Sequence, residues 1–280
     1  MTDSRILFES HSHTPLCKHA SGEPTEYAAI AEARGLRGLH VTCHNPMPDG
    51  FSAAVRMAES EFDQYVDLVA ATTDEWRGRV DVRLGLEADY YEGYEAYLEK
   101  QLASADFHFV LGSVHPQIPE FRHRYWDDGD HVEMQHLYFR LLAQSAETGL
   151  FDSLAHPDLI KNMTSDAWQP DSILDAIKPQ LDRIAATGVA MELNTSGAYK
   201  RVREMNPFPA MLREMCERGI PVTLGADAHV PHRVSEGYEA AMSLLLEAGY
   251  SHVNFFLERK RQEVAITEAL ASLIPLEVKA

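Results

Sequence analysis

Residues 9–19 read Glu-Ser-His-Ser-His-Thr-Pro-Leu-Cys-Lys-His and directly follow the short apolar run Ile6-Leu7-Phe8. In an extended segment, side chains two residues apart point the same way, so His11 and His13 can face one point at the end of a strand. A loop that carries His19 could bring a third imidazole to that point. Alone, this spacing is equally well explained by exposed loop histidines. Because neutral imidazole is a common metal ligand, the stretch predicts a metal site if other segments supply matching ligands.

The composition is that of an ordinary globular protein, with 45% apolar and 24% charged residues in 280. This length suits one large α/β domain as well as two small ones. The 43 acidic and 25 basic residues give a formal net charge of −18. Such a charge repels phosphate backbones unless metal ions reverse the field locally, which argues against duplex nucleic acid as a partner.

The cysteines and the amino terminus bear on the compartment. Cys17, Cys43 and Cys216 are widely spaced and odd in number, so a reducing compartment without a disulfide framework is favoured. Cys17 and Cys43 stand beside histidines; we interpret them as small buried apolar residues, with metal ligation as the alternative. The amino-terminal residues lack a signal-peptide pattern, and no apolar run approaches ~18 residues. We therefore expect a cytoplasmic protein that does not interact with membranes.

Apolar runs alternate with helical patterns along the whole chain, without a linker. Strands are predicted at 6–8, 38–42, 80–86, 107–114, 151–155, 189–194 and 221–226, and helices at 26–34, 52–76, 92–104, 131–147, 170–186, 207–218 and 235–248. A closing segment at 253–257 follows, and residues 117–130 are interpreted as a loop that could cover a site. Seven strand-then-helix units imply parallel strands with right-handed crossovers. We therefore expect a seven-unit β/α barrel in a single domain spanning 1–280, because a barrel gathers functional residues at one end.

Residues of the types that commonly bind metal ions lie at the carboxyl ends of six predicted strands. They are His11, His13, His19, His44, Glu87, His115, His156, Asp227 and His229. Their shared position predicts a multinuclear metal site. Mixed nitrogen and oxygen ligands fit Zn, Mn or Fe. The remaining histidines lie within predicted strands, loops or helices and are interpreted as ordinary polar or core residues.

These motifs resemble those of the polymerase-and-histidinol-phosphatase (PHP) family over residues 6–230. The matching motifs are His11-Ser12-His13 with His19, Cys43-His44-Asn45-Pro46, Glu87, Gly112-Ser113-Val114-His115, Ala155-His156-Pro157-Asp158 and Ala226-Asp227-Ala228-His229. The segments 14–17, 44–46 and 156–161 are similar to the histidinol-phosphatase branch of that family.

The resemblance implies a distorted (β/α)7 TIM-like barrel that binds three divalent ions. One would be held by His11, His13, Glu87 and Asp227, the second by a bridging Glu87 with His115 and His156, and the third by His19, His44 and His229. Two neighbouring metals can share a water and lower its pKa from about 15.7 towards ~7, which yields a hydroxide nucleophile. The third can bind phosphoryl oxygens and offset the charge that develops in an in-line displacement.

The expected reaction is hydrolysis of a phosphate monoester. The resemblance adds the substrate, L-histidinol phosphate, which would give L-histidinol and phosphate in histidine biosynthesis. One alternative is a PHP phosphoesterase that acts on another small phosphate ester or a nucleotide, including exonuclease activity. Another is a metal-binding protein without catalysis.

Further residues are candidates for catalysis or substrate binding. Asp227 or His229 could pass a proton to the leaving alkoxide, although a metal-bound water could do so too. Lys161 follows a ligand-bearing strand end and is either a phosphate clamp or a solvated lysine. Asn194 ends the one predicted strand without a ligand and is either a substrate contact or a plain turn residue.

Overall fold

Parallel strands form the centre of the molecule. The computed structural model describes residues 5–126 and 129–275. Within these ranges the strands are β1 Phe8–Glu9, β2 Gly38–Val41, β3 Asp81–Asp89, β4 Phe109–Ser113, β5 Ser153–Leu154, β6 Ala190–Asn194, β7 Val222–Gly225, β8 His252–Leu257 and β9 Lys260–Ala265. They pair in sequence order, parallel from β1 to β8 and antiparallel between β8 and β9. Each of the seven predicted strands is therefore found in its predicted place in the sheet.

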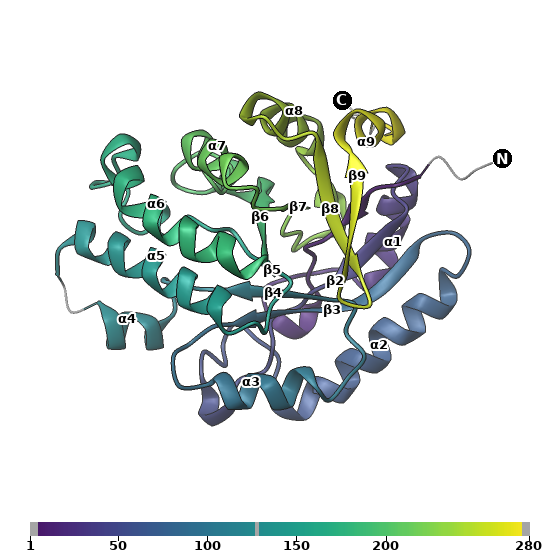
Figure 1. Cartoon of the computed structure of the whole chain (residues 1–280). Helices are drawn as coiled ribbons and strands as arrows, with labels where there is room; N and C mark the ends of the chain where they lie inside the picture. The colour runs from purple at the N-terminus through teal and green to yellow at the C-terminus, as the bar shows by residue number, and fades with distance from the viewer. Residues whose placement is uncertain (1–4, 127–128, 276–280) are drawn as a thin grey trace.

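The helices surround these strands, as Figure 1 shows. They are α1 Pro24–Ala33, α2 Phe62–Glu75, α3 Glu95–Leu102, α4 Pro119–Tyr125, α5 His131–Glu147, α6 Pro170–Thr187, α7 Pro209–Glu217, α8 Tyr238–Ala248 and α9 Ile266–Ser272. Four of them, α1, α4, α6 and α7, have proline in the first turn, where its missing N–H costs no hydrogen bond. Gly188 ends α6 in a left-handed conformation at φ 75°. These local signals explain why most helix boundaries lie close to the predicted ones.

The sheet closes between its first and seventh strands. Ser12, just beyond β1, forms a parallel bridge with Ala228, just beyond β7. The backbone N–H of His13 donates to the Ala228 carbonyl, and that of Ala228 donates to the His11 carbonyl, both at 3.0 Å. The predicted α/β barrel of seven units is thus confirmed, and its closure places the His11–His13 segment beside the Asp227–His229 segment.

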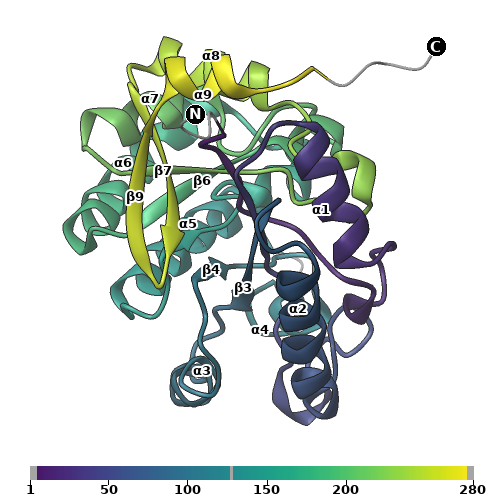
Figure 2. The same cartoon turned by 90° about the vertical axis from the view of Figure 1, so that its right-hand side faces the viewer.

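A hairpin that the sequence analysis does not predict covers the amino-terminal end of the strands, opposite the end at which the His11–His13 and Asp227–His229 segments meet. It consists of β8 and β9, the long two-stranded ribbon in Figure 2. The Phe255 ring stacks on Phe8 at 4.5 Å between centroids, and Phe256 stacks on Phe109 at 5.3 Å. Phe8 and Phe109 begin β1 and β4, so the hairpin lies at the amino-terminal end and leaves the carboxyl end open.

Two predicted elements are wrong. The predicted helix 52–76 begins only at Phe62, because residues before it are tied to the barrel: Ser52 has φ 47° and donates through its N–H to Glu120 at 2.7 Å. Arg56 is buried and pairs with Asp89 at 2.6 Å. Within the predicted loop 117–130, residues 119–125 form the helix α4, and positions 127–128 lie outside the described residues.

None of the helices in the described ranges combines the length and the apolar content needed to cross a bilayer.

Candidate metal centre

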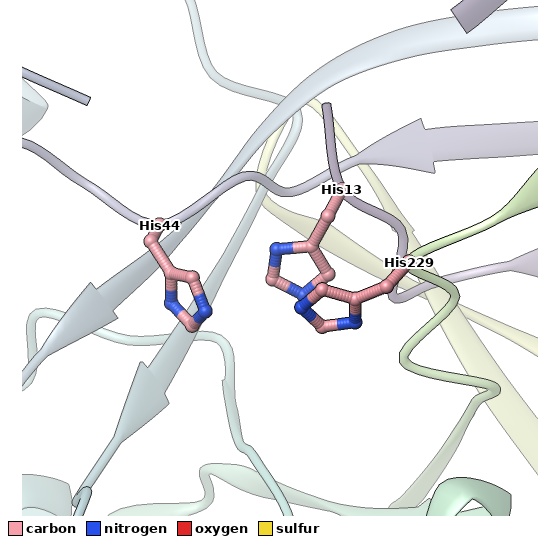
Figure 3. A group of neighbouring side chains, drawn as sticks. All are labelled: His13, His44 and His229. Atoms are coloured by element: carbon pink, nitrogen blue, oxygen red, sulfur yellow. The ribbon is translucent and has the colours of Figure 1, made fainter. Parts of the chain in front are cut away.

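The nine predicted ligands meet at the carboxyl end of the strands. Figure 3 shows how His13, His44 and His229, from three separate segments, turn their rings towards one region. The ring centroids of His13 and His229 lie 4.0 Å apart, and those of His13 and His44 lie 4.6 Å apart. Groups of these side chains offer ligand atoms within 4.8 Å of one another, as a metal ion requires. The buried histidine, aspartate and glutamate clusters are therefore metal-binding clusters.

Glu87 lies at the middle of the centre, fully buried. Its Oε1 atom is 3.0 Å from His156 Nε2 and 3.3 Å from His115 Nε2. Its Oε2 atom is 2.8 Å from His44 Nδ1 and 3.4 Å from His11 Nε2. The two oxygens thus face different histidines, which is the arrangement a bridging carboxylate needs.

Asp227 completes a second group with His11 and His13. Its Oδ1 atom lies 3.2 Å from His13 Nε2 and 3.7 Å from His11 Nε2. The Asp227 backbone has φ 50° and that of His156 has φ 29°, values that non-glycine residues rarely adopt and that cost roughly 1–3 kcal/mol each. Both residues follow a strand, and this unusual backbone redirects their side chains to the centre.

His19 and His229 form the more exposed edge. Their Nε2 atoms are 2.9 Å apart. The other ring nitrogen of each faces a backbone carbonyl, His19 Nδ1 at 2.7 Å from Cys17 O and His229 Nδ1 at 3.0 Å from Asp227 O. These contacts orient both Nε2 atoms towards the same place.

The polar atoms at the centre are better satisfied by coordinating a cation than by hydrogen bonds to one another. Several buried ligand atoms have no hydrogen-bond partner among the described residues, namely His11 Nε2, His13 Nε2, His44 Nδ1 and Glu87 Oε2. His44 Nδ1 and Glu87 Oε2 face each other without the alignment of a hydrogen bond. Buried polar atoms without partners are costly, and metal coordination would satisfy them.

Two buried carboxylates that the sequence analysis misses hold the ligands in place. Glu192 Oε1 lies 2.7 Å from His11 Nδ1, and its Oε2 accepts the His156 backbone N–H at 2.8 Å. Asp89 Oδ1 lies 2.7 Å from His115 Nδ1. Such partners fix the orientation and raise the basicity of a metal-binding histidine. The available signal was a carboxylate inside an apolar strand, two residues away from a predicted site residue.

Glycine at position 225 makes room for one of these partners. A Cβ atom built there would meet Glu192 Oε1 at 1.9 Å and His11 Cβ at 2.7 Å. Any side chain on β7 at this point would push Glu192 away from His11.

Charges within the centre balance one another in the metal-free protein. Burial alone would raise the pKa of Glu87, but His44, His11 and His115 hold it well below its ordinary value. Burial alone would lower the pKa of His115, yet Asp89 and Glu87 raise it to about 10. Burial lowers the pKa of His44 to about 4 and that of His229 to about 3. The carboxylates are therefore ionised, and the cationic histidines beside them occupy positions that metal ions can take over.

A cavity of about 350 Å³ opens over the centre. It is lined by His19, His44, Glu87, His115, Gln117, His156, Leu159, Ser196, Tyr199, Lys200, Asp227, His229 and Arg233. Its size suits a small organic molecule. The cationic side chains Lys200 and Arg233, which the sequence analysis does not single out, both reach this cavity.

The structure does not bring the two predicted substrate contacts to this cavity. Lys161 is fully buried, and its Nζ donates to Met205 O at 2.7 Å and to Asp158 Oδ2 at 3.0 Å. Asn194 is also buried; it donates to Glu192 Oε2 at 3.0 Å and accepts from Ser196. In this conformation Lys161 ties two loops together, and Asn194 supports Glu192.

Fold and site together define a β/α barrel with a metal-binding centre at the carboxyl ends of its strands. The family of PHP domains matches residues 9–196. A probable histidinol-phosphatase of Deinococcus radiodurans is 40% identical over 255 residues, which cover 89% of this chain and 96% of that protein. The chain therefore belongs to the PHP domain family.

Two more distant proteins are also similar to this chain over most of its length. A histidinol-phosphatase of Bacillus subtilis is 25% identical over 260 residues, covering 83% of this chain and 97% of that protein. A crystal structure of histidinol phosphate phosphatase from Lactococcus lactis, complexed with zinc, L-histidinol and phosphate, superimposes with a TM-score of 0.78. It is 19% identical and covers 91% of this chain and 98% of that one, so the likeness establishes the shared fold.

Proposed function

We propose that this protein is a metal-dependent histidinol-phosphatase, which hydrolyses L-histidinol phosphate to L-histidinol and phosphate. The observation that carries this proposal is that the nine predicted ligands cluster together and seven of them line one cavity, in a chain 40% identical to a probable histidinol-phosphatase over nearly its whole length. The cavity is also large enough for a single small phosphate ester.

We further propose three divalent ions, held as the family resemblance implies. The support is geometric. His11, His13 and Asp227 form one group within ligand distance, Glu87 contacts His115 and His156, and His19 meets His229 at the exposed edge. Zinc is bound by the Lactococcus lactis protein, and the nitrogen and oxygen ligands here suit zinc, manganese or iron. When bound, such ions acidify water and stabilise charge on phosphoryl oxygens.

The side chains around the centre have separate tasks in this proposal. Lys200 Nζ lies 3.4 Å from Asp227 Oδ2, and Arg233 stands over the Tyr199 ring at 4.4 Å. Both cations line the cavity, so they can attract the phosphate group and offset its charge in an otherwise acidic protein. They are better placed for this than Lys161.

Proton transfer falls to a group that also lines the cavity. Asp227 is held ionised, because nearby His11 and Lys200 lower its pKa although burial opposes this. The Asp227 carboxylate can take a proton from the attacking water at Oδ2, the oxygen nearest Lys200, and pass it to the leaving alkoxide. His229 also lines the cavity and is the second candidate for this transfer.

We also propose that residues 1–280 work as one domain in the cytoplasm. Asp227 and His229 lie beyond the part that the PHP family matches, yet they contact His13 and His19 from within it. The segment after β7 is therefore needed to complete the centre, as is the segment after β1.

The test is a comparison of substrates with zinc- or manganese-loaded protein. Release of phosphate from L-histidinol phosphate should exceed that from sugar phosphates and nucleotides, and a DNA oligomer should stay intact. Equal rates on all small esters would replace the histidinol assignment with a general phosphoesterase. Metal uptake without any turnover would favour a non-catalytic metal-binding protein.

A further inference from the structure

Cys17 lies beside the exposed edge of the metal centre. Its sulfur and the ring nitrogens of His19 and His229 all lie within 4.8 Å of one another. Cys17 is fully buried at the end of the short 3-10 helix Pro15–Cys17. The next residue, Lys18, has a left-handed backbone with φ 70°, which turns His19 back towards the sulfur. The turn at residues 17–19 thus places the Cys17 sulfur and the His19 imidazole together, and His229 joins them from beyond the end of β7.

The neighbouring Cys43 has a different environment. It is equally buried, but its sulfur accepts a hydrogen bond from Thr14 Oγ1 at 3.1 Å and donates one to the Thr14 carbonyl at 3.6 Å. Its sulfur lies near Cys17 and His13, yet it is not part of the group formed with His19 and His229. The two cysteines therefore differ in position relative to the exposed edge, although both satisfy the interpretation as buried residues.

We infer that Cys17 supplies a sulfur ligand to the ion held by His19 and His229. This inference rests on the metal centre of the proposed function. On binding, the sulfur coordinates as a thiolate and a metal–sulfur bond forms; any proton that the sulfur carries passes to solvent, and no oxidation state changes. Two further facts agree: His13 and His44 form a group within ligand distance with His229, and the Cys17 sulfur is buried.

Sulfur at this position has a consequence for metal choice. Thiolate and imidazole ligands favour zinc over manganese and magnesium, whereas mixed carboxylate and imidazole ligands accept a wider range of ions. The edge containing Cys17 should therefore be selective for zinc, while the group around Glu87 tolerates manganese or iron. One protein can in this way bind different metals at neighbouring positions.

X-ray absorption at the zinc edge tests the inference directly. Zinc-loaded protein should show a sulfur shell at about 2.3 Å beside nitrogen and oxygen at about 2.0–2.1 Å. The shell should vanish in Cys17→Ser and persist in the matched variant Cys43→Ser. After cobalt loading, a near-ultraviolet sulfur-to-cobalt charge-transfer band should follow the same pattern. Cys17→Ser should also weaken the binding of one zinc by at least about 10- to 100-fold, the loss typical when only a supporting partner is removed.

The outcomes separate this inference from the proposed function. The inference would be overturned if the sulfur shell were retained in Cys17→Ser or were absent from the unchanged protein. Intact turnover of histidinol phosphate in the same samples would leave the proposed function standing. A sulfur shell in a protein that hydrolyses other esters equally well would uphold the inference and refute the substrate. A protein that binds no zinc would overturn both. Circular dichroism of the two serine variants checks that each is folded.

Discussion

The metal centre has two parts that differ in burial and in support. The inner part comprises His11, His13, Glu87, His115, His156 and Asp227, and the outer part comprises His19, His44 and His229. Every inner residue is at most 9% exposed, whereas His19 is exposed and the His229 side chain is 26% exposed. Inner histidines are supported by carboxylates, as His11 is by Glu192 and His115 by Asp89. The outer pair, His19 and His229, is supported by backbone carbonyls.

This difference indicates a division of labour. Ionised carboxylates in a buried site increase both the charge and the basicity that hold a cation. Within the outer part, His19 and His229 lack this support, because they are less buried and their Nδ1 atoms face backbone carbonyls, whereas His44 is buried beside Glu87. All three border the cavity. We therefore expect inner ions to be held tightly and the outer ion to exchange more readily. Four predictions test this comparison: three variants in order of decreasing effect, followed by a pH dependence.

Glu87→Gln should have the largest effect, because Glu87 contacts histidines of both parts through its two oxygens. We expect loss of bound metal and a fall in turnover of about 1,000-fold or more, because the ions that stabilise charge on the phosphoryl group would no longer be held. Metal analysis by mass spectrometry and steady-state kinetics measure both. The control is Asp81→Asn at the other end of β3, where the carboxylate pairs with Arg83. Full metal content in Glu87→Gln would refute its bridging role.

Glu192→Gln should have an intermediate effect. An amide cannot accept hydrogen bonds through both of its termini, so it cannot serve His11 and the His156 backbone N–H together. We expect metal affinity or turnover to fall about 10- to 100-fold, the range found for partners of metal ligands. Glu214→Gln, on α7 and paired with Arg218, is the control. If both variants bind metal like the unchanged protein, Glu192 has no positioning role.

His19→Ala should have a smaller effect, confined to the outer part. We expect metal content to drop by one exchangeable ion while the inner ions stay, and turnover to fall about tenfold, at the low end of the same range. Metal analysis after brief chelator treatment distinguishes the two classes of ion. Loss of all metal in this variant would mean that the two parts do not bind independently.

The fourth prediction concerns pH. Burial alone would lower the pKa of His13, but Asp227, Cys17 and Glu87 raise it to about 9, and the pKa of His115 is raised to about 10. The imidazoles of His13 and His115 are thus protonated at pH 7 before metal binds, and a metal ion must displace one proton from each. Raising the pH removes the protons, so binding should tighten by about tenfold per pH unit for each proton displaced, up to about pH 9–10.

Calorimetry in buffers of different ionisation enthalpy counts these protons. Loading of the inner part at pH 7 should release them to the buffer, whereas His44 and His229, whose pKa values burial lowers, should contribute none. Heats that do not depend on the buffer would contradict the raised pKa values.

Local sequence signals predict the centre well because the ligands obey a simple rule. In a parallel β/α barrel, residues just beyond each strand share one end of the fold. Histidines and carboxylates at those positions, such as His115 after β4 and His156 after β5, are therefore neighbours whatever their distance along the chain. The supporting partners do not follow this rule. Glu192 lies inside β6 and Asp89 is the last residue of β3, and the sequence alone does not indicate which histidine either carboxylate faces.

Other errors have equally physical causes. The β8–β9 hairpin turns at Glu258 and Arg259, which adopt φ 52° and 60° without the glycine or asparagine that usually marks such a turn. The predicted helix before Phe62 carries a suitable apolar pattern, but buried Arg56 pairs with Asp89 and that contact prevails over helix propensity. Lys161, interpreted from the sequence as either a phosphate clamp or a solvated lysine, is not solvated, because it is buried against Asp158 and Met205; its role as a phosphate contact stays a prediction.

The amino-acid sequence by itself determined the seven strand-and-helix units, the family and the predicted metal-binding residues, because these depend on periodicity and on residue identity. Only the tertiary structure decided which carboxylate supports which histidine, which cations reach the cavity and which cysteine lies beside His19 and His229. Those are contacts between side chains from different strands and loops, and they depend on how the barrel closes, on the left-handed turns at its rim and on what packs beneath it.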